Sequence, residues 1–161
     1  MKAKSTPIVR LDYAQAKIVV QGLPDRPGSA AALFHDLADA NLFADTIVEN
    51  TGSEGTSTLT LTLPEGKRLR AFEVIKRALS KIGDGRILMH GPIAKLTVAG
   101  TKPGSQGLVS ARLFEALGAV GINIDMISTS EALTTVVVST DRANEALKVA
   151  GQAFEQSGVS H

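Results

Sequence analysis

The chain has 161 residues, of which 43% are hydrophobic and only 4% aromatic, so we expect a soluble protein with an aliphatic core. Its 17 basic and 16 acidic residues give a net charge of +1, which supplies no electrostatic case for nucleic acid or a membrane surface. There is no cysteine, no apolar run of transmembrane length and no signal peptide, so disulfides and thiolate chemistry are excluded and a reducing cytoplasm is expected.

The first half of the chain predicts a β-α-β-β-α-β unit, the ferredoxin-like split arrangement with both helices on one face of the sheet. The strand at residues 58–63 alternates threonine with leucine, which is typical of a half-buried strand. A hairpin loop at residues 51–55 precedes it, and Gly83 ends the second helix. We predict strands at 17–21, 44–50, 58–63 and 86–89, and helices at 29–41 and 72–82.

The second half predicts the same order with one strand missing. Because an incomplete sheet would leave an exposed edge, we expect the spare segment at residues 7–11 to supply the absent strand. The first unit, residues 14–91, would then be inserted into the second, residues 1–13 plus 92–161. The alternative is a disordered N-terminal tail. The predicted elements are strands at 93–99, 124–130 and 134–139, and helices at 110–120 and 142–154.

One pattern occurs twice in the chain. Leu33 and Phe34 return as Leu113 and Phe114, an offset of 80 (113 − 33 = 80), and an Asp-x-Ile run at residue 45 returns at residue 125. Two similar half-domains usually build sites at the seam between them. The duplication therefore favours a paired ligand-sensing module over a single catalytic pocket.

The loop before the first helix has the composition of an amino-acid clamp. Pro27 suits the first turn of a helix, and Gly28 lets a ligand approach the backbone closely. The free amides of the helix start favour a carboxylate, and Asp25 can accept hydrogen bonds from an ammonium group. The alternative is an ordinary helix entry with Asp25 as its cap.

Other polar residues are weaker candidates. Asp45 and Asp125 lie at equivalent positions where a helix leads into a strand, and Asn123 offers an amide beside the second of them. These residues either line a seam shared by the two units or form ordinary turns. Glu49 and Glu131 are strand carboxylates that are either ligand contacts or solvated groups.

Catalysis is poorly supported by the sequence. The three histidines form no recognisable triad or metal spacing, and no phosphate-binding glycine loop is present. We therefore expect no catalytic residue, no metal and no cofactor. The glycine-bearing segment at residues 101–107 is interpreted as the second unit's counterpart of the Asp25 loop, two residues longer.

Two runs carry a resemblance to a known family. The loop at residues 22–28, Gly-Leu-Pro-Asp-Arg-Pro-Gly, resembles the first-repeat loop of the tandem ACT domains of aspartokinase. The run at residues 121–131, Gly-Ile-Asn-Ile-Asp-Met-Ile-Ser-Thr-Ser-Glu, is similar to the hallmark of the second repeat, and the Phe-Glu-Ala-Leu run at 114–117 and Leu-Asp at 11–12 also fall where the family has them. The similarity covers nearly the whole chain. The catalytic kinase portion that normally precedes these repeats in the family is absent from this sequence.

The resemblance implies an α+β fold of two interlocked ACT domains and a regulatory, non-catalytic subunit. It would form a homodimer, bind threonine, lysine or both, and inhibit phosphorylation of aspartate by a catalytic subunit. By resemblance, the threonine site uses these residues of the first unit and of a facing second unit: Asp25, Pro27, Gly28, Ser29, Ala30 and Glu49, with Asn123, Ile124 and Asp125. A second effector site would use Asp45, Leu108, Ser130 and Glu131.

Departures from the family pattern favour threonine over lysine. Leu108 stands where the family has a glycine, and Glu49 stands where it commonly has a glutamine. Three alternatives stay open: a free-standing ACT sensor for another amino acid, a structural kinase subunit with degenerate sites, and a small ferredoxin-like enzyme such as a phosphatase.

Overall fold

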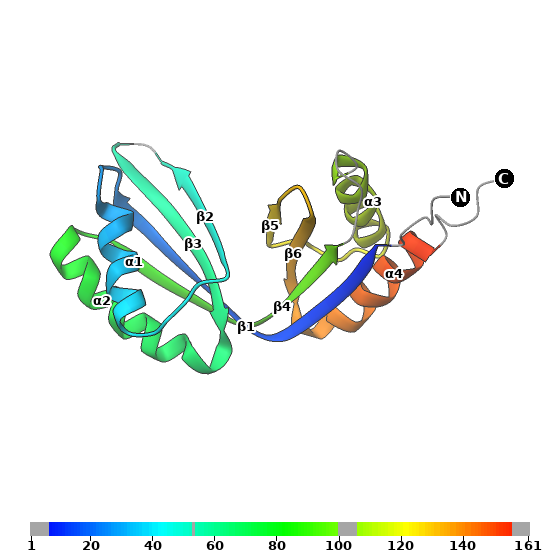
Figure 1. Ribbon diagram of the computed structural model, residues 1–161, viewed down its shortest axis with the longest axis horizontal. Helices are drawn as coiled ribbons and strands as arrows, with labels where there is room; N and C mark the ends of the chain where they lie inside the picture. The colour runs from blue at the N-terminus through cyan, green and yellow to red at the C-terminus, as the bar shows by residue number, and fades with distance from the viewer. Residues whose placement is uncertain (1–6, 53, 100–105, 156–161) are drawn as a thin grey trace. The chain divides into compact units, whose positions relative to one another are not determined.

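The computed structural model describes residues 7–52, 54–99 and 106–155. The chain divides into two compact units (Figure 1). Ala14–Pro92 forms one of them, which we call the inserted unit. The residues up to Tyr13, together with those from Ile93 onward, form the other, which we call the host unit.

The inserted unit has the strand order β2-β3-β1-β4, and α1 and α2 lie together on one face of its sheet (Figure 1). β3 alternates as the sequence predicts, so Leu59, Leu61 and Leu63 are buried in the core with the apolar face of α2. The elements that lie wholly within it are α1 (Ser29–Asp39), β2 (Thr46–Thr51), β3 (Thr56–Pro64), the 3-10 helix η1 (Glu65–Lys67) and α2 (Arg68–Ile82). It also contains the part of β1 (Ile8–Pro24) from Ala14 onward and the part of β4 (Arg86–Ala99) up to Pro92.

The host unit repeats this order as β1-β4-β6-β5, with α3 and α4 in contact. Val9 and Leu11 of β1 pack against its core, and the Tyr13 hydroxyl donates a hydrogen bond to the side chain of Asn144 on α4. Its further elements are α3 (Gln106–Ala119), β5 (Met126–Thr129), β6 (Leu133–Ser139), the 3-10 helix η2 (Thr140–Arg142) and α4 (Ala143–Glu155). Two ferredoxin-like units, one inserted into the other, confirm the predicted α+β fold class.

The duplication extends to the backbone of the turn that ends the first helix of each unit. The Leu42 amide donates to the Leu37 carbonyl at 2.9 Å, and the Ile122 amide donates to the Leu117 carbonyl at 3.0 Å. Each turn contains one residue of positive φ, Asn41 at 55° in one unit and a glycine at 68° in the other. Both helices therefore end in the same left-handed turn.

Several predicted boundaries differ from the structure. The strands expected at 86–89 and 93–99 are one strand, β4, and the segments expected at 7–11 and 17–21 are one strand, β1. α3 begins at Gln106 rather than at residue 110, so the last two residues of the predicted loop, 106 and 107, are helical. The rest of that loop, residues 101–105, lies outside the described residues. No helix in the described ranges is long and apolar enough to cross a membrane.

Candidate functional site

The start of α1 offers unpaired backbone donors. Gly28 precedes the helix with φ 93°, a left-handed conformation that favours glycine, and no side chain caps the helix. Its carbonyl accepts the Ala32 amide at 2.9 Å, but within the described residues the amides of Ala30 and Ala31 have no hydrogen-bond partner. Two free N–H groups at the positive end of a helix dipole form a site suited to a carboxylate.

A buried hydroxyl lies on the same turn. Ser29 is 6% exposed, and its Oγ makes no hydrogen bond among the described residues. Buried polar groups are rarely left without a partner, so this oxygen is a candidate ligand contact. In the host unit the equivalent position (29 + 80 = 109) is Val109, whose buried side chain has no polar atom.

The loop that leads into α1 is braced by its neighbours. The Asp25 amide donates to the Gly55 carbonyl at 2.8 Å, and the Arg26 side chain donates from Nη2 to the Ile82 carbonyl at 2.7 Å. The side chains of Asp25 and Pro27 are exposed, as a ligand-facing loop requires. The sequence analysis did not single out Arg26. The available signals were an arginine in this loop and a helix that ends at Gly83, because an arginine side chain can bond the last carbonyls of a helix.

Two carboxylates, one on β2 and one just before it, are held by the adjacent strand β3. Ser57 donates to Glu49 at 2.9 Å, and the Thr62 hydroxyl donates to Asp45. The Asp45 amide also donates to the Thr62 carbonyl at 3.0 Å. Both carboxylates are therefore oriented by β3, and Asp45 fixes the entry into β2, which agrees with its structural interpretation as a turn residue.

The equivalent residues of the host unit mostly form turns. Asn123 donates from Nδ2 to Asp125 at 2.9 Å, and the Asp125 amide donates to the Val137 carbonyl at 2.9 Å. The Ser130 hydroxyl accepts the amides of Ala132 and Leu133 in the β5–β6 turn, at 3.4 and 3.2 Å. Ile124 packs against the host core, and Glu131 is exposed.

The two helix starts are not equivalent. Leu108 lies inside α3 and is 61% exposed, whereas Gly28, its counterpart, precedes α1 (28 + 80 = 108). The first turns of α3 are tied to β6, because Gln106 donates to the Thr134 hydroxyl at 3.2 Å and the Ser110 hydroxyl lies 2.9 Å from it. In the aligned numbering α3 therefore begins at the position of Arg26 (106 − 80 = 26), earlier than α1 begins.

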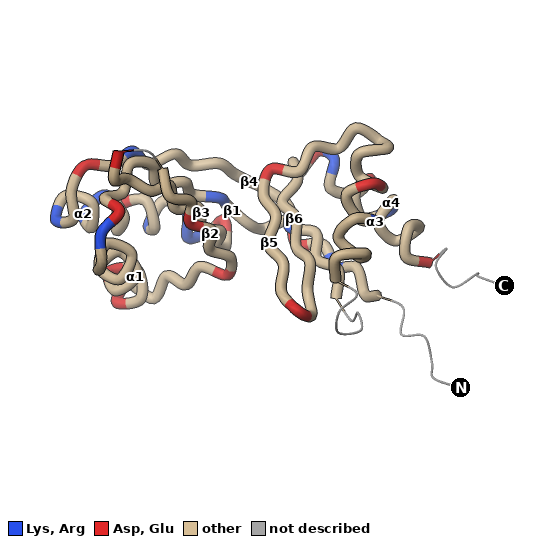
Figure 2. The backbone as a smooth tube through the Cα atoms, turned by 90° about the horizontal axis from the view of Figure 1, so that it is seen from above, with Lys and Arg blue, Asp and Glu red and all other residues tan. Residues whose placement is uncertain are grey.

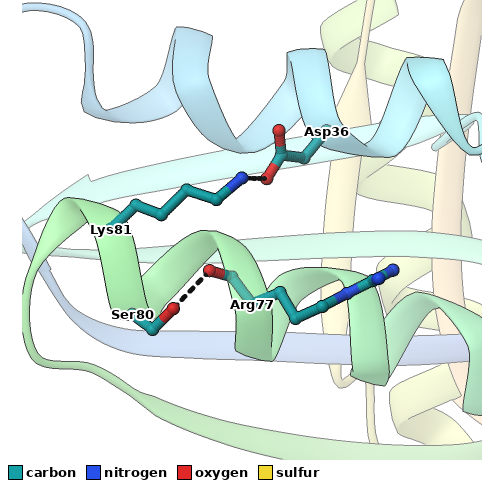
Figure 3. Close-up of polar contacts among 4 residues, drawn as sticks. All are labelled: Asp36, Arg77, Ser80 and Lys81. Atoms are coloured by element: carbon teal, nitrogen blue, oxygen red, sulfur yellow. Dashed lines mark hydrogen bonds and ion pairs between the residues drawn. The ribbon is translucent and has the colours of Figure 1, made fainter.

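A separate cleft of about 440 Å³ lies between α1 and α2. Lys and Arg are frequent along α2 (Figure 2), and Lys81 forms an ion pair of 3.0 Å with Asp36 of α1 (Figure 3). The Ser80 hydroxyl donates to the Arg77 carbonyl, while the Arg77 guanidinium points away from this pair (Figure 3). Asp36 lies about 8–9 Å along the helix from the free amides. We therefore regard the cleft as a seam between two helices. It is lined by Asp36, Asp39, Ala40, Val74, Arg77, Ser80 and Lys81.

No group of three His, Asp or Glu side chains in the described part of the chain is placed to hold a metal ion.

A model of the ACT domain family matches residues 96–154, most of the host unit. The aspartokinase of Corynebacterium efficiens is 33% identical over 152 residues, which cover 93% of this chain and 36% of that protein.

The solved structures decide the family. The crystal structure of the regulatory subunit of aspartate kinase from Thermus thermophilus matches with a TM-score of 0.83 at 33% identity, covering 91% of this chain and 96% of that one. This chain belongs to the aspartokinase family. A structure of the aspartokinase alpha and beta subunits matches equally, with a TM-score of 0.83 at 33% identity, covering 91% of this chain and 97% of that one.

The matched regions also place the chain within the family. It spans about a third of the length of the curated aspartokinase, 36%, and nearly all of the Thermus regulatory subunit. It therefore corresponds to the regulatory ACT region, which is not itself catalytic. The family resemblance drawn from the loop at 22–28 and the run at 121–131 is confirmed.

Proposed function

We propose that this regulatory ACT region binds a feedback amino acid, threonine in the first place, at the start of α1. Bound there, the amino acid would inhibit phosphorylation of aspartate by a catalytic partner subunit. The observation that carries the proposal is the pair of free amides at Ala30 and Ala31 beside the unpartnered hydroxyl of Ser29. The ligand carboxylate would accept from the two amides, and its ammonium group would donate to the exposed Asp25.

Two features favour threonine over lysine. Glu49 lies on β2 with one oxygen bonded to Ser57, and it is an acceptor for a ligand hydroxyl. The residues suggested for a lysine site are less free, since the Ser130 hydroxyl accepts two backbone amides. Leu108 within α3 gives that position a large side chain in place of the glycine that precedes α1.

The proposal includes a homodimer. The edge strands β2 and β5 each expose an isoleucine at the equivalent position, Ile47 at 50% and Ile127 at 45%. Apolar side chains on an unpaired edge strand are a feature of interfaces. Pairing the inserted unit of one chain with the host unit of another would bring Asn123, Ile124 and Asp125 to the effector. A cytoplasmic location stays a prediction.

Inhibition would operate by differential affinity. The effector must bind the inhibitory arrangement of the complex more tightly than the active one, and couplings of about 1–3 kcal/mol are typical. By linkage, assembly with the catalytic subunit in its inhibited state would tighten threonine binding by the same factor.

Titration calorimetry of the purified chain with threonine and with lysine tests the proposal. We expect heat and a raised melting temperature with threonine, and a weaker response or none with lysine. A screen of the remaining amino acids serves as the control for a free-standing sensor of another ligand. Absence of binding to every amino acid, with a reconstituted kinase insensitive to all of them, would refute the sensor role and leave a structural subunit.

A further inference from the structure

The guanidinium of Arg26 bridges two parts of the inserted unit that are far apart in sequence. It donates from Nη2 to the Ile82 carbonyl at 2.7 Å, at the C-terminal end of α2. The Arg26 backbone belongs to the turn before α1, since its amide donates to the Pro24 carbonyl at 3.0 Å and its carbonyl accepts the Ser29 amide at 3.2 Å. One residue therefore links the entry of α1 to the end of α2.

The electrostatics of this bond are favourable. The last carbonyls of a helix lack intrahelical partners and carry the negative end of the helix dipole, so a cation that donates to one of them is stabilised. A second contact supports the same arrangement, because a Cβ placed on Gly83 would lie 2.9 Å from Cγ of Pro24. Gly83, at φ 146°, thus lets Pro24 pack closely on the end of α2.

The host unit provides an internal comparison. The residue equivalent to Arg26 is Gln106 (26 + 80 = 106), which lies within α3 and donates to Thr134 of β6. Among the described residues, that position is therefore held to the sheet by a helical side chain. The arginine bridge is observed in the unit that has the free helix amides.

We propose that Arg26 is a positioning residue of the effector site. Its bond to the Ile82 carbonyl holds the loop at residues 25–28 in the conformation that presents the amides of Ala30 and Ala31. Loop position and effector binding then reinforce each other, and by linkage an effector on α1 stabilises the last turn of α2. The inference rests on the proposed function for the identity of the ligand, but the effect of Arg26 on the loop is independent of it.

The test compares Arg26→Gln and Arg26→Lys with Arg68→Gln. Arg68 is the matched control because its guanidinium also donates to a backbone carbonyl of the inserted unit, that of Gly91 at 3.4 Å. It begins α2, about 20 Å along the helix from Ile82. The measurements are the dissociation constant for threonine by calorimetry, the melting temperature, and amide hydrogen exchange with and without threonine.

We expect Arg26→Gln to raise the dissociation constant about tenfold, because the competent loop conformation becomes a minor population. Arg26→Lys should restore part of the affinity, since an ammonium group can still donate one bond. Arg68→Gln, which also removes an ion pair of 3.2 Å with Glu65, should lower the melting temperature and leave the dissociation constant within about twofold. Threonine should slow exchange of the Gly83 amide in the wild type and in Arg68→Gln, but not in Arg26→Gln.

The two proposals fail in different ways. If the wild type binds threonine and Arg26→Gln binds it equally well, the positioning role is wrong and the proposed function stands. If the wild type binds no amino acid, the proposed function is wrong. The Asp25 and Ser29 amides are hydrogen-bonded in this loop, and their exchange in the unliganded protein then still decides the positioning role, which requires faster exchange in Arg26→Gln than in Arg68→Gln.

Discussion

Arg142 donates a hydrogen bond of 2.8 Å from Nη2 to the Val120 carbonyl at the end of α3. The inserted unit has the same relationship in weaker form, since Lys67 donates to the Asn41 carbonyl at 3.3 Å. In both units the cation lies in the 3-10 turn that precedes the second helix. It caps the C-terminal end of the first helix, where the dipole favours positive charge.

Arg142→Gln should destabilise the protein more than Lys67→Gln does, because a charged donor is removed from a half-buried carbonyl. Arg142 also donates from Nε to Glu145 at 2.7 Å, and this contact raises the pKa of the guanidinium. Lys67→Gln, which removes an exposed and longer bond, should cost less than about 0.5 kcal/mol. Urea unfolding of both variants checks the difference, and equal losses would contradict the assignment.

Ser29→Ala should leave the unliganded protein as stable or slightly more stable, by up to about 1 kcal/mol, because a buried hydroxyl without a partner is removed. Threonine binding should weaken if that hydroxyl contacts the ligand. Val109→Ala provides the contrast at the equivalent position, and loss of its buried methyl groups should cost about 1–2 kcal/mol. Thermal melting with and without threonine measures both effects. Destabilisation of the unliganded protein by Ser29→Ala would show that the hydroxyl already has a structural partner.

Thr134→Val should destabilise the host unit by about 1–2 kcal/mol, since Thr134 is fully buried and its hydroxyl bonds Ser110 and Gln106. Thr135→Val is the matched control. Its hydroxyl pairs with that of Thr97 at 3.0 Å on a half-buried surface, where water can replace the bond. Chemical denaturation should give a clearly larger loss for Thr134→Val. A double-mutant cycle with Ser110→Ala should show coupling, and additive losses would disprove the network.

The stability of the protein at low pH should depend on the carboxyl group of Asp141. The Ser139 hydroxyl holds the pKa of Asp141 below its ordinary value by hydrogen bonding to the carboxylate. A carboxyl whose pKa is lowered by folding stabilises the native state above its unfolded pKa of about 4, and this contribution is lost as the pH falls through the folded pKa. Ser139→Ala should therefore raise the pKa of Asp141, as followed by carboxyl NMR titration. In an Asp141→Asn background, Ser139→Ala should no longer change the acid dependence of melting.

Much of the fold was predictable because the periodic segments are strong. The alternating leucines of β3 and the offset that relates Leu33 to Leu113 predicted the strand type and the duplication. The continuity of β4 through Gly91 and Pro92 was not predictable, since both residues usually interrupt strands. Gly107 misled the prediction in the same way, because tertiary contacts of Gln106 with β6 extend α3 through it.

The site was only partly predictable. The position of Gly28 at a helix start follows from local sequence, and Gly28 does precede α1 in a left-handed conformation. Its contact with a ligand stays a prediction. Which carboxylates are already bonded depends on strand register, so the contact between Glu49 and Ser57 emerges only from the folded β2–β3 pair. The bridge from Arg26 to Ile82 joins residues 56 apart in sequence, and no local pattern specifies it.

The unbroken course of β1 has a consequence for how this protein can be made and dissected. The division between the units falls after Tyr13, within the strand Ile8–Pro24, so the segment that completes the host sheet is synthesised before the inserted unit. The part of its neighbour β4 that belongs to the host unit emerges from the ribosome only after the whole inserted unit. Residues 14–92 can be excised as one continuous piece, whereas a gene fragment that begins at Ile93 must be given its missing strand as a separate peptide or by circular permutation.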